Sequence, residues 1–299
     1  MEKEVKRNFI IGDEWIYFKI YTGIKTSDLI LTDYLYPVLK KMTQKEYIDK
    51  WFFIRYHDPS FHLRLRLHIT DEKYLSEIIK EINLCLKDFL NLDLIWKIQL
   101  DTYNRELERY GHKSIESSES LFYHDSEMIT NALMVIEEHE NQNMKWLFGL
   151  MAVDALMKDF NLSLEGSKNL MEDLKNNFGS EMGIDSKMKK QLSMKYQKHK
   201  VEIYNFFNSN EALDTQSKFL MDLIKVKSTS ISKEITFIKE NNNDFNSLSN
   251  IIASHIHMIM NRLFRIRNRE AEFVCYQMLY YYYESVIARN KYNTAITHE

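Results

Sequence analysis

The first third of the chain alternates between short apolar or aromatic runs and longer segments whose apolar residues recur at helical spacing. Four runs fit strands: 15–21, 50–56, 61–69 and 94–100. Two helices are predicted between them, one capped by Thr26, Ser27 or Asp28 and ending near Thr43, and one running from Asp71 through Leu86. The order β-α-β-β-α-β predicts a ferredoxin-like antiparallel sheet backed by two helices.

From about Ser114 onward, strand patterns give way to amphipathic helical segments. The helices predicted there are 127–140, 143–160, 186–207, 215–224 and 246–265. Asp125 and Ser126 are predicted to cap the first of them, and Ser247 the last. Polar breaks at 208–210 and 241–244 indicate loops, because the composition does not change across them. We therefore expect an α+β fold in a single domain over 1–299, with a β-rich part over 1–113 and a helical part over 114–299.

The composition narrows the class of protein. Only 7 Gly and 2 Pro in 299 residues favour helices, and 40 basic against 43 acidic side chains provide no net positive field for a nucleic acid. Cys85 and Cys275 belong to no metal-binding or disulfide pattern. The charged N-terminus and the absence of a long apolar run predict a cytoplasmic protein without a membrane span.

The third predicted strand has an unusual pattern. A period of two places His62, Arg64, Arg66 and His68 on one face and three leucines on the other. Like charges two residues apart on one strand face repel, so the pattern suggests that an anion binds there. The alternative, a solvated face whose arginines pair with acids on neighbouring strands, is equally open from this strand alone.

Two further clusters could carry chemistry. Glu106 and Arg109 are three residues apart, which one helical turn would place on the same face. In the helix 246–265, Ser254, His257 and Asn261 form a polar stripe beside an apolar one. His255 and His257 point to different sides of that helix, so the sequence predicts no metal site there.

Several motifs, taken in order along the chain, resemble those of the C-terminal elimination domain of lantibiotic dehydratases, also found as free-standing thiopeptide-type bacteriocin biosynthesis proteins. They are 51–56, Asp58 with Pro59, 62–66, Tyr103 with Glu106 and 109–111, Asp125 with Ser126, and His257 with 261–263. The resemblance runs from about Trp15 to the last helices. His112 departs from it, because family members often have a second glycine at that position.

The resemblance implies that glutamylated Ser or Thr of a ribosomally made precursor peptide loses glutamate to give dehydroalanine or dehydrobutyrine. It implies catalytic roles for His257, Arg66 and Arg109 and substrate-binding roles for Arg64 and Glu106, and we expect His62 and Asn261 to assist in binding. His257 would move the proton, since an imidazole changes charge near neutral pH. The arginines would hold carboxylates through forked hydrogen bonds. No cofactor or metal is implied.

The glutamylating region of such dehydratases is missing from this sequence, so a separate tRNA-dependent glutamylation protein is the expected partner. No direct contact with nucleic acid is expected, and a homodimer is left open. Two other functions stay open. A pyridine synthase would join two dehydroalanines by a formal cycloaddition, and a non-catalytic subunit would only grip the peptide.

Overall fold

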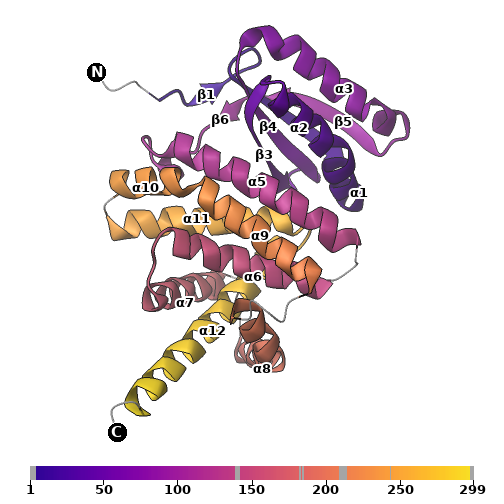
Figure 1. Cartoon of the computed structure of the whole chain (residues 1–299). Helices are drawn as coiled ribbons and strands as arrows, with labels where there is room; N and C mark the ends of the chain where they lie inside the picture. Colours follow the sequence, from indigo (N-terminus) through magenta and orange to yellow (C-terminus); the bar gives the residue numbers. More distant parts are fainter. Residues whose placement is uncertain are drawn as a thin grey trace.

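The computed structural model describes residues 5–138, 142–181, 183, 185–208, 214–242 and 244–296. Its main sheet contains β2 (Trp15–Thr22), β3 (Ile48–Tyr56), β4 (His62–Ile69) and β5 (Ile95–Asp101). The four strands are antiparallel and lie in the order β3-β4-β2-β5 (Figure 1). This is the strand order of the ferredoxin-like fold, so the predicted α+β class and sheet pattern are confirmed.

One face of the sheet is covered by the helices that connect its strands (Figure 1). They are α1 (Ile24–Leu29), the π-helix η1 (Ile30–Leu35), α2 (Tyr36–Gln44), the short 3-10 helix η2 (Glu72–Tyr74) and α3 (Leu75–Asn91). Leu63, Leu65 and Leu67 of β4 are buried in the core that these helices share with the sheet.

The predicted cap of the first helix is wrong. The helix α1 begins at Ile24 after Gly23, without a side-chain cap. Ser27 and Asp28 lie inside it and are buried, because Asp28 forms an ion pair of 2.5 Å with Arg55 of β3. The sequence suggested Asp28 as a helix cap, but in the structure its carboxylate pairs with the buried guanidinium of Arg55 instead.

After β5 the chain forms the short strand β6 (Tyr103–Asn104), paired with β1 (Asn8–Phe9), and the one-turn helix α4 (Leu107–Tyr110). The helical part then follows: α5 (Ile115–Glu138), α6 (Gln142–Asp159), α7 (Leu164–Glu181), α8 (Ser186–Asn208), α9 (Thr215–Ser230), α10 (Ser232–Asn241), α11 (Phe245–Leu263) and α12 (Asn268–Ile296). Figure 1 shows α5 between the sheet and the other helices, and the C-terminal end of α12 extending away from them.

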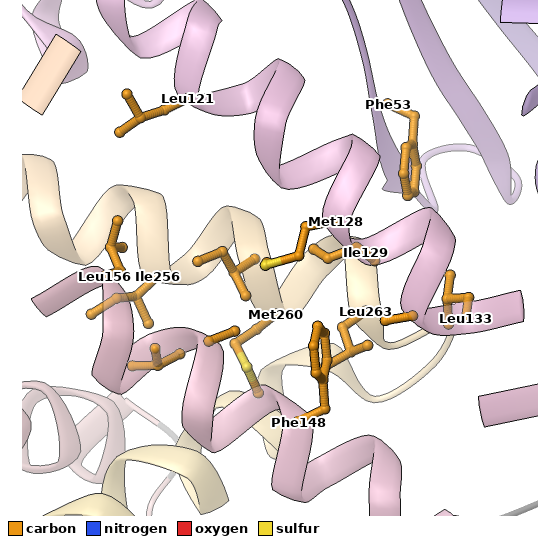
Figure 2. Packing of buried hydrophobic residues seen from close by; sticks show 14 of the residues in the cluster. Phe53, Leu121, Met128, Ile129, Leu133, Phe148, Leu156, Ile256, Met260 and Leu263 are labelled. Carbon is orange, nitrogen blue, oxygen red and sulfur yellow. The ribbon is translucent and has the colours of Figure 1, made fainter. Parts of the chain in front are cut away.

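A continuous apolar core joins the two parts. Figure 2 shows Phe53 of β3, Met128 of α5, Phe148 of α6 and Met260 of α11 around the same interior, and all four are almost fully buried. Gly149 of α6 lies against α11, where an added Cβ would stand 3.1 Å from the Leu263 side chain. Close packing of α6 on α11 therefore depends on the missing side chain at this position.

Two polar contacts attach the helical part to the outer edge of the sheet. The backbone N–H of Phe53 donates to the Ser126 hydroxyl of α5 at 3.3 Å. The Asn261 amide of α11 accepts from the Arg55 N–H and donates to the Arg55 carbonyl, each at 2.9 Å. An uncovered edge strand would leave such groups unpaired, so α5 and α11 supply partners for three backbone groups at the edge of β3.

These contacts correct two more predicted caps. Asp125 and Ser126 do not start a helix, because α5 already begins at Ile115. Both residues lie in the middle of α5 and are fully buried. At the start of α11 the cap is Asp244, whose carboxylate accepts from the Ser247 N–H at 2.9 Å. Of the two predicted loops, 209–210 and 243 lie outside the described residues. Among the residues that are described, no helix is long and apolar enough to cross a bilayer.

Candidate active site

The polar face of β4 is solvated only in part: His62 and Arg66 are buried, whereas Arg64 and His68 are partly exposed and His68 pairs with Asp49 of β3. The part around Arg66 is not a solvated surface. It is covered by a second cluster of buried side chains, which we call the aromatic cluster: Phe9, Trp15, Tyr17, Phe52, Tyr103, Leu107, Tyr110, Ile115 and Phe122. The segment 103–110 and the start of α5 supply its upper layer, so this part of the face that the sequence predicts to be cationic becomes a second interior.

Arg66 is enclosed in this aromatic cluster and is only 8% exposed. Its guanidinium lies 4.4 Å from the ring centre of Tyr17 and 4.8 Å from that of Tyr103. Among the described residues no carboxylate lies within ion-pair distance of Arg66, and its Nε donates no hydrogen bond. A buried guanidinium without an acid favours an anionic ligand over the alternative of pairing with neighbouring strands.

The Arg66 side chain lines a cavity of about 30 Å³ between β4, the segment 103–106 and α11. Met258 lines it from α11, and the polar side chains of its wall are Arg66, Tyr103, Asn104, Glu106, Tyr110 and Arg262. This volume holds about two water molecules. In the structure the cavity is therefore a small site of mixed apolar and polar lining, too small for an amino acid.

A buried ion pair holds the wall of this cavity in place. Arg105, just before Glu106, contacts the Glu119 carboxylate of α5 through Nε at 2.8 Å and Nη2 at 2.7 Å. The Tyr103 hydroxyl donates to the same carboxylate at 2.8 Å. Both ionic partners are almost fully buried, so the strand β6 and the beginning of α4 are fixed on α5.

Glu106 and Arg109 form the outer rim of the cavity. Their side chains lie on the same face, as predicted, and form an ion pair with 3.2 Å between Arg109 Nε and Glu106 Oε2. Glu106 is 59% exposed and Arg109 is 45% exposed. Helix α4 ends at Gly111, whose φ of +78° favours glycine. Glu106 lines the cavity, whereas Arg109 is not among its lining residues.

His62 and Arg64 lie further along the same face of β4. The His62 ring is buried; it contacts the Ser60 carbonyl through Nδ1 at 2.8 Å and accepts from Arg64 Nε at 3.2 Å. Burial lowers the pKa of His62, so the ring is neutral. The Arg64 guanidinium stacks 3.4 Å from the ring centre of Tyr56. His62 therefore supports Arg64, and neither residue lines the cavity with Arg66.

His257 is not in the cavity either. Its side chain leaves α11 about 100° around the helix from Met258 and contacts α12. There His257 Nδ1 lies 2.9 Å from the Glu272 carboxylate, which also accepts from the Tyr276 hydroxyl. The imidazole is partly exposed. Asn261 uses its amide oxygen and one amide N–H on the Arg55 backbone, and it does not line the cavity.

The sequence analysis missed the charged residues behind the cavity. Arg262 is fully buried, and none of its guanidinium nitrogens has a hydrogen-bond partner among the described residues. Asp125 of α5 is also fully buried and lies 3.5 Å from Lys227 Nζ of α9. The signal in the sequence was Arg262 itself, a charge on a helix side that it shares with Ile251, His255 and Met258.

Burial also shifts the titration of these groups. It lowers the pKa of Arg262 to about 10, a loss that the nearby Asp125 partly opposes, so the guanidinium stays charged at neutral pH. His255 packs against the rings of Tyr110 and Phe122, with 5.3 Å between ring centres in each case. Burial lowers its pKa to about 3, so this imidazole is neutral.

A larger hollow, of about 480 Å³, lies between α7 and α12, with Lys175 and Tyr280 in its wall. It contains none of the residues that the sequence predicts for a site, and we place the chemistry at the smaller cavity because buried, unpaired charges converge there. Over the described parts of the chain, no group of His, Cys, Asp and Glu side chains could hold a metal ion.

Known proteins resemble this chain over most of its length. The profile of the family described as lantibiotic biosynthesis dehydratase C-term matches residues 15–283. The chain is 26% identical over 260 residues to the subtilin biosynthesis protein SpaB of Bacillus subtilis, covering 84% of this chain and 24% of SpaB. It is 29% identical over 269 residues to the epidermin biosynthesis protein EpiB of Staphylococcus epidermidis, covering 86% of this chain and 25% of EpiB. The chain thus spans about a quarter of these relatives.

Solved structures share the fold. The tRNA-dependent lantibiotic dehydratase MibB from Microbispora sp. 107891 superposes with a TM-score of 0.70 at 20% identity, covering 93% of this chain and 29% of MibB. The pyridine synthase TbtD from thiomuracin biosynthesis superposes with a TM-score of 0.61 at 12% identity, covering 89% of this chain and 97% of TbtD. With the family profile matching from the first strand of the main sheet into the last helix, the chain belongs to the lantibiotic biosynthesis dehydratase C-terminal family.

Proposed function

We propose that this chain removes glutamate from glutamylated Ser or Thr residues of a ribosomal precursor peptide, giving dehydroalanine or dehydrobutyrine. The observation that supports it best is Arg66, a buried guanidinium that lines a small cavity and has no acid within ion-pair distance among the described residues. Such a site favours a carboxylate, and glutamate is the dicarboxylic amino acid that this elimination releases. Membership of the family adds the peptide substrate to the proposal.

In the elimination, a base takes the proton from Cα of the modified residue. The electron pair of that C–H bond forms the Cα–Cβ double bond, the Cβ–O bond breaks, and glutamate leaves with the oxygen and the electron pair of the Cβ–O bond. The products are the dehydroamino acid, free glutamate and the protonated base. The barrier falls if the charge that develops on the leaving carboxylate meets fixed donors.

The guanidinium groups would supply those donors. Arg66 would hold a glutamyl carboxylate inside the cavity, and Arg109 at the rim and Arg64 further along β4 would attract the charged substrate and the leaving group. Glu106, which lines the cavity and is more than half exposed, would contact the glutamyl ammonium. Since the cavity is narrower than a glutamyl group, the substrate would enter by moving this rim outward.

For the proton, His257 remains the candidate base. Glu272 at 2.9 Å fixes one ring nitrogen, which leaves Nε2 as the acceptor. Because the side chain stands outside the cavity, the peptide backbone would have to cross the exposed side of α11 while its glutamyl group occupies the cavity. His62 and Asn261 would act only by supporting Arg64 and the sheet edge.

The test is a single-turnover reaction with a chemically glutamylated Ser peptide, analysed by mass spectrometry. The parent chain should release glutamate and leave a peptide containing dehydroalanine. Arg66→Met should lower the rate at least 100-fold, and His257→Ala should lower it while preserving peptide binding. Arg289→Met, which changes an arginine of α12 outside this site, is the control.

Three outcomes would contradict the proposal. Binding of the glutamylated peptide without release of glutamate would indicate a non-catalytic subunit. Conversion of a peptide with two dehydroalanines, without activity on the glutamylated peptide, would indicate a pyridine synthase. Parental rates for both Arg66→Met and His257→Ala would refute the assigned residues.

A further inference from the structure

We propose that Arg262 is the second guanidinium of a carboxylate-binding site whose first is Arg66, and that Asp125 positions Arg262 from behind. The inference rests on the proposed function, in which a glutamyl group enters this cavity. It adds a specificity-determining residue on α11 and an orientation for the substrate.

Arg262 is built into the cavity as an unpaired charge. It is fully buried, and its Nε, Nη1 and Nη2 all lack a hydrogen-bond partner in the described structure. Its guanidinium lies 5.3 Å from the ring centre of Phe122. Buried donors are normally satisfied, so three open nitrogens beside this cavity indicate a place for an anion or for the water that an anion displaces.

Asp125 supports Arg262 without occupying its donors. It is the main attractive charge acting on Arg262, yet it stands beyond ion-pair distance and lies nearer to Lys227, at 3.5 Å. Lys227 in turn lies 3.6 Å from Asp159. The carboxylate of Asp125 is thus held by another cation, and the donors of Arg262 stay free for a ligand.

The two arginines come from different walls, Arg66 from β4 and Arg262 from α11. A carboxylate between them could accept forked hydrogen bonds from both guanidinium groups, a geometry that Lys does not reproduce. The acid in the wall, Glu106, lies at the exposed rim. A ligand with an inner carboxylate and an outer ammonium fits this polarity, so the glutamyl side chain points inward and its ammonium faces Glu106.

The experiment measures binding of free L-glutamate and of glutarate, which lacks the ammonium, to the whole chain by titration calorimetry. Compared with the parent, Arg262→Met should weaken binding of both at least 10-fold, and Glu106→Gln should weaken glutamate more than glutarate. Arg289→Met should bind as the parent does. Methylguanidine should restore glutamate binding to Arg262→Ala, whereas methylammonium should not.

Thermal unfolding separates binding from structure. Replacing an unpaired buried charge with an apolar side chain of similar length is often neutral or stabilising, so Arg262→Met should melt no lower than the parent. Asp125→Asn should weaken glutamate binding, because the Arg262 guanidinium loses the charge that positions it.

Parental glutamate affinity in Arg262→Met would overturn the inference, as would the absence of measurable glutamate binding to the parent. Release of glutamate from the glutamylated peptide at the parental rate by Arg262→Met would also overturn it and leave the proposed function intact. Arg262-dependent binding by a parent chain that releases no glutamate would support the carboxylate site and refute the proposed function.

Discussion

The side-chain amide of Asn261 pairs with both the N–H and the carbonyl of Arg55, residues more than 200 positions apart in the chain. In this way α11 acts as an additional hydrogen-bonding partner of the edge strand β3. The same helix carries Met258 and Arg262 into the cavity. The attachment therefore sets the position of the cavity wall as well as the closure of the sheet.

Replacing Asn261, whose side chain does not itself line the cavity, should destabilise the protein. Asn261→Leu leaves the Arg55 backbone groups buried and unpaired, and we expect a loss of about 2–4 kcal/mol in the free energy of unfolding. Urea denaturation measures it. Asn250→Ala, an exposed change on the same helix, should stay within about 0.5 kcal/mol of the parent. Equal midpoints for the two variants would contradict this role.

The ion pair between Asp28 and Arg55 should be a second determinant of stability. Both side chains are almost fully buried, and removing the Asp28 carboxylate leaves the buried Arg55 without its acid and also breaks the 3.2 Å ion pair of Asp28 with Arg265. Asp28→Asn should cost about 3–5 kcal/mol in chemical denaturation. The matched variant is Asp222→Asn, whose ion pair with Lys225 is exposed on both sides and should contribute less than about 1 kcal/mol. A loss of similar size in both variants would argue against the buried pair.

His255 should make the protein sensitive to acid. Its folded-state pKa is about 3, below the ordinary 6.5 of histidine, and Lys227 and Arg262 are the cations that face it. Its contribution to stability is therefore complete above pH 6.5 and is lost as the pH falls toward 3, because the unfolded chain binds the proton first. His62 and His124 are shifted in the same direction.

The slope of stability against pH tests this assignment. One proton changes the free energy of unfolding by roughly 1.4 kcal/mol per pH unit, so His255→Leu should show a slope shallower by about that amount between pH 6 and 4. Denaturation of parent and variant at pH 8, where the imidazole is neutral in both states, isolates the packing effect of the substitution. Identical slopes below pH 6 would disprove a neutral, buried His255.

Gly111 should be intolerant of a side chain. Its φ of +78° is unfavourable for other residues, so Gly111→Ala should cost roughly 1–3 kcal/mol. The strain would also shift α4, and glutamate release should fall by more than the stability loss explains. Gly166→Ala, within α7 and without a positive φ, should be neutral or slightly stabilising. Full activity and stability of Gly111→Ala would show that this turn does not position Glu106.

The local pattern of apolar and polar residues was sufficient to predict the sheet and the helices that connect its strands. The alternation of leucine and charged residues from His62 to His68 predicted the two faces of β4, and the apolar spacing predicted the connecting helices. The motifs of the resemblance predicted the family. These features depend on period and order along the chain, which a sequence displays directly.

The local pattern could not predict which side chains from distant segments contact each other. Asp125 fitted a helix cap in the sequence and is instead buried inside α5 beside Lys227. The resemblance implied that His257 moves the proton of the substrate that the arginines hold, yet the cavity takes Met258 and Arg262 from that helix. Consecutive residues of a helix point about 100° apart, so a rotation of α11 by that angle would turn His257 instead of Met258 toward the cavity. Only the packing of α11 on α12 and on the sheet sets that rotation.

The sequence by itself determined the order of elements, the ferredoxin-like sheet, the cationic face of β4 and the family. Only the tertiary structure decided which charged side chains lack partners, because the burial and the ion pairs of a side chain depend on residues that are distant in the sequence. Arg66 and Arg262 lie almost 200 positions apart, on a strand and a helix, and their charges become a single site only where those elements pack together.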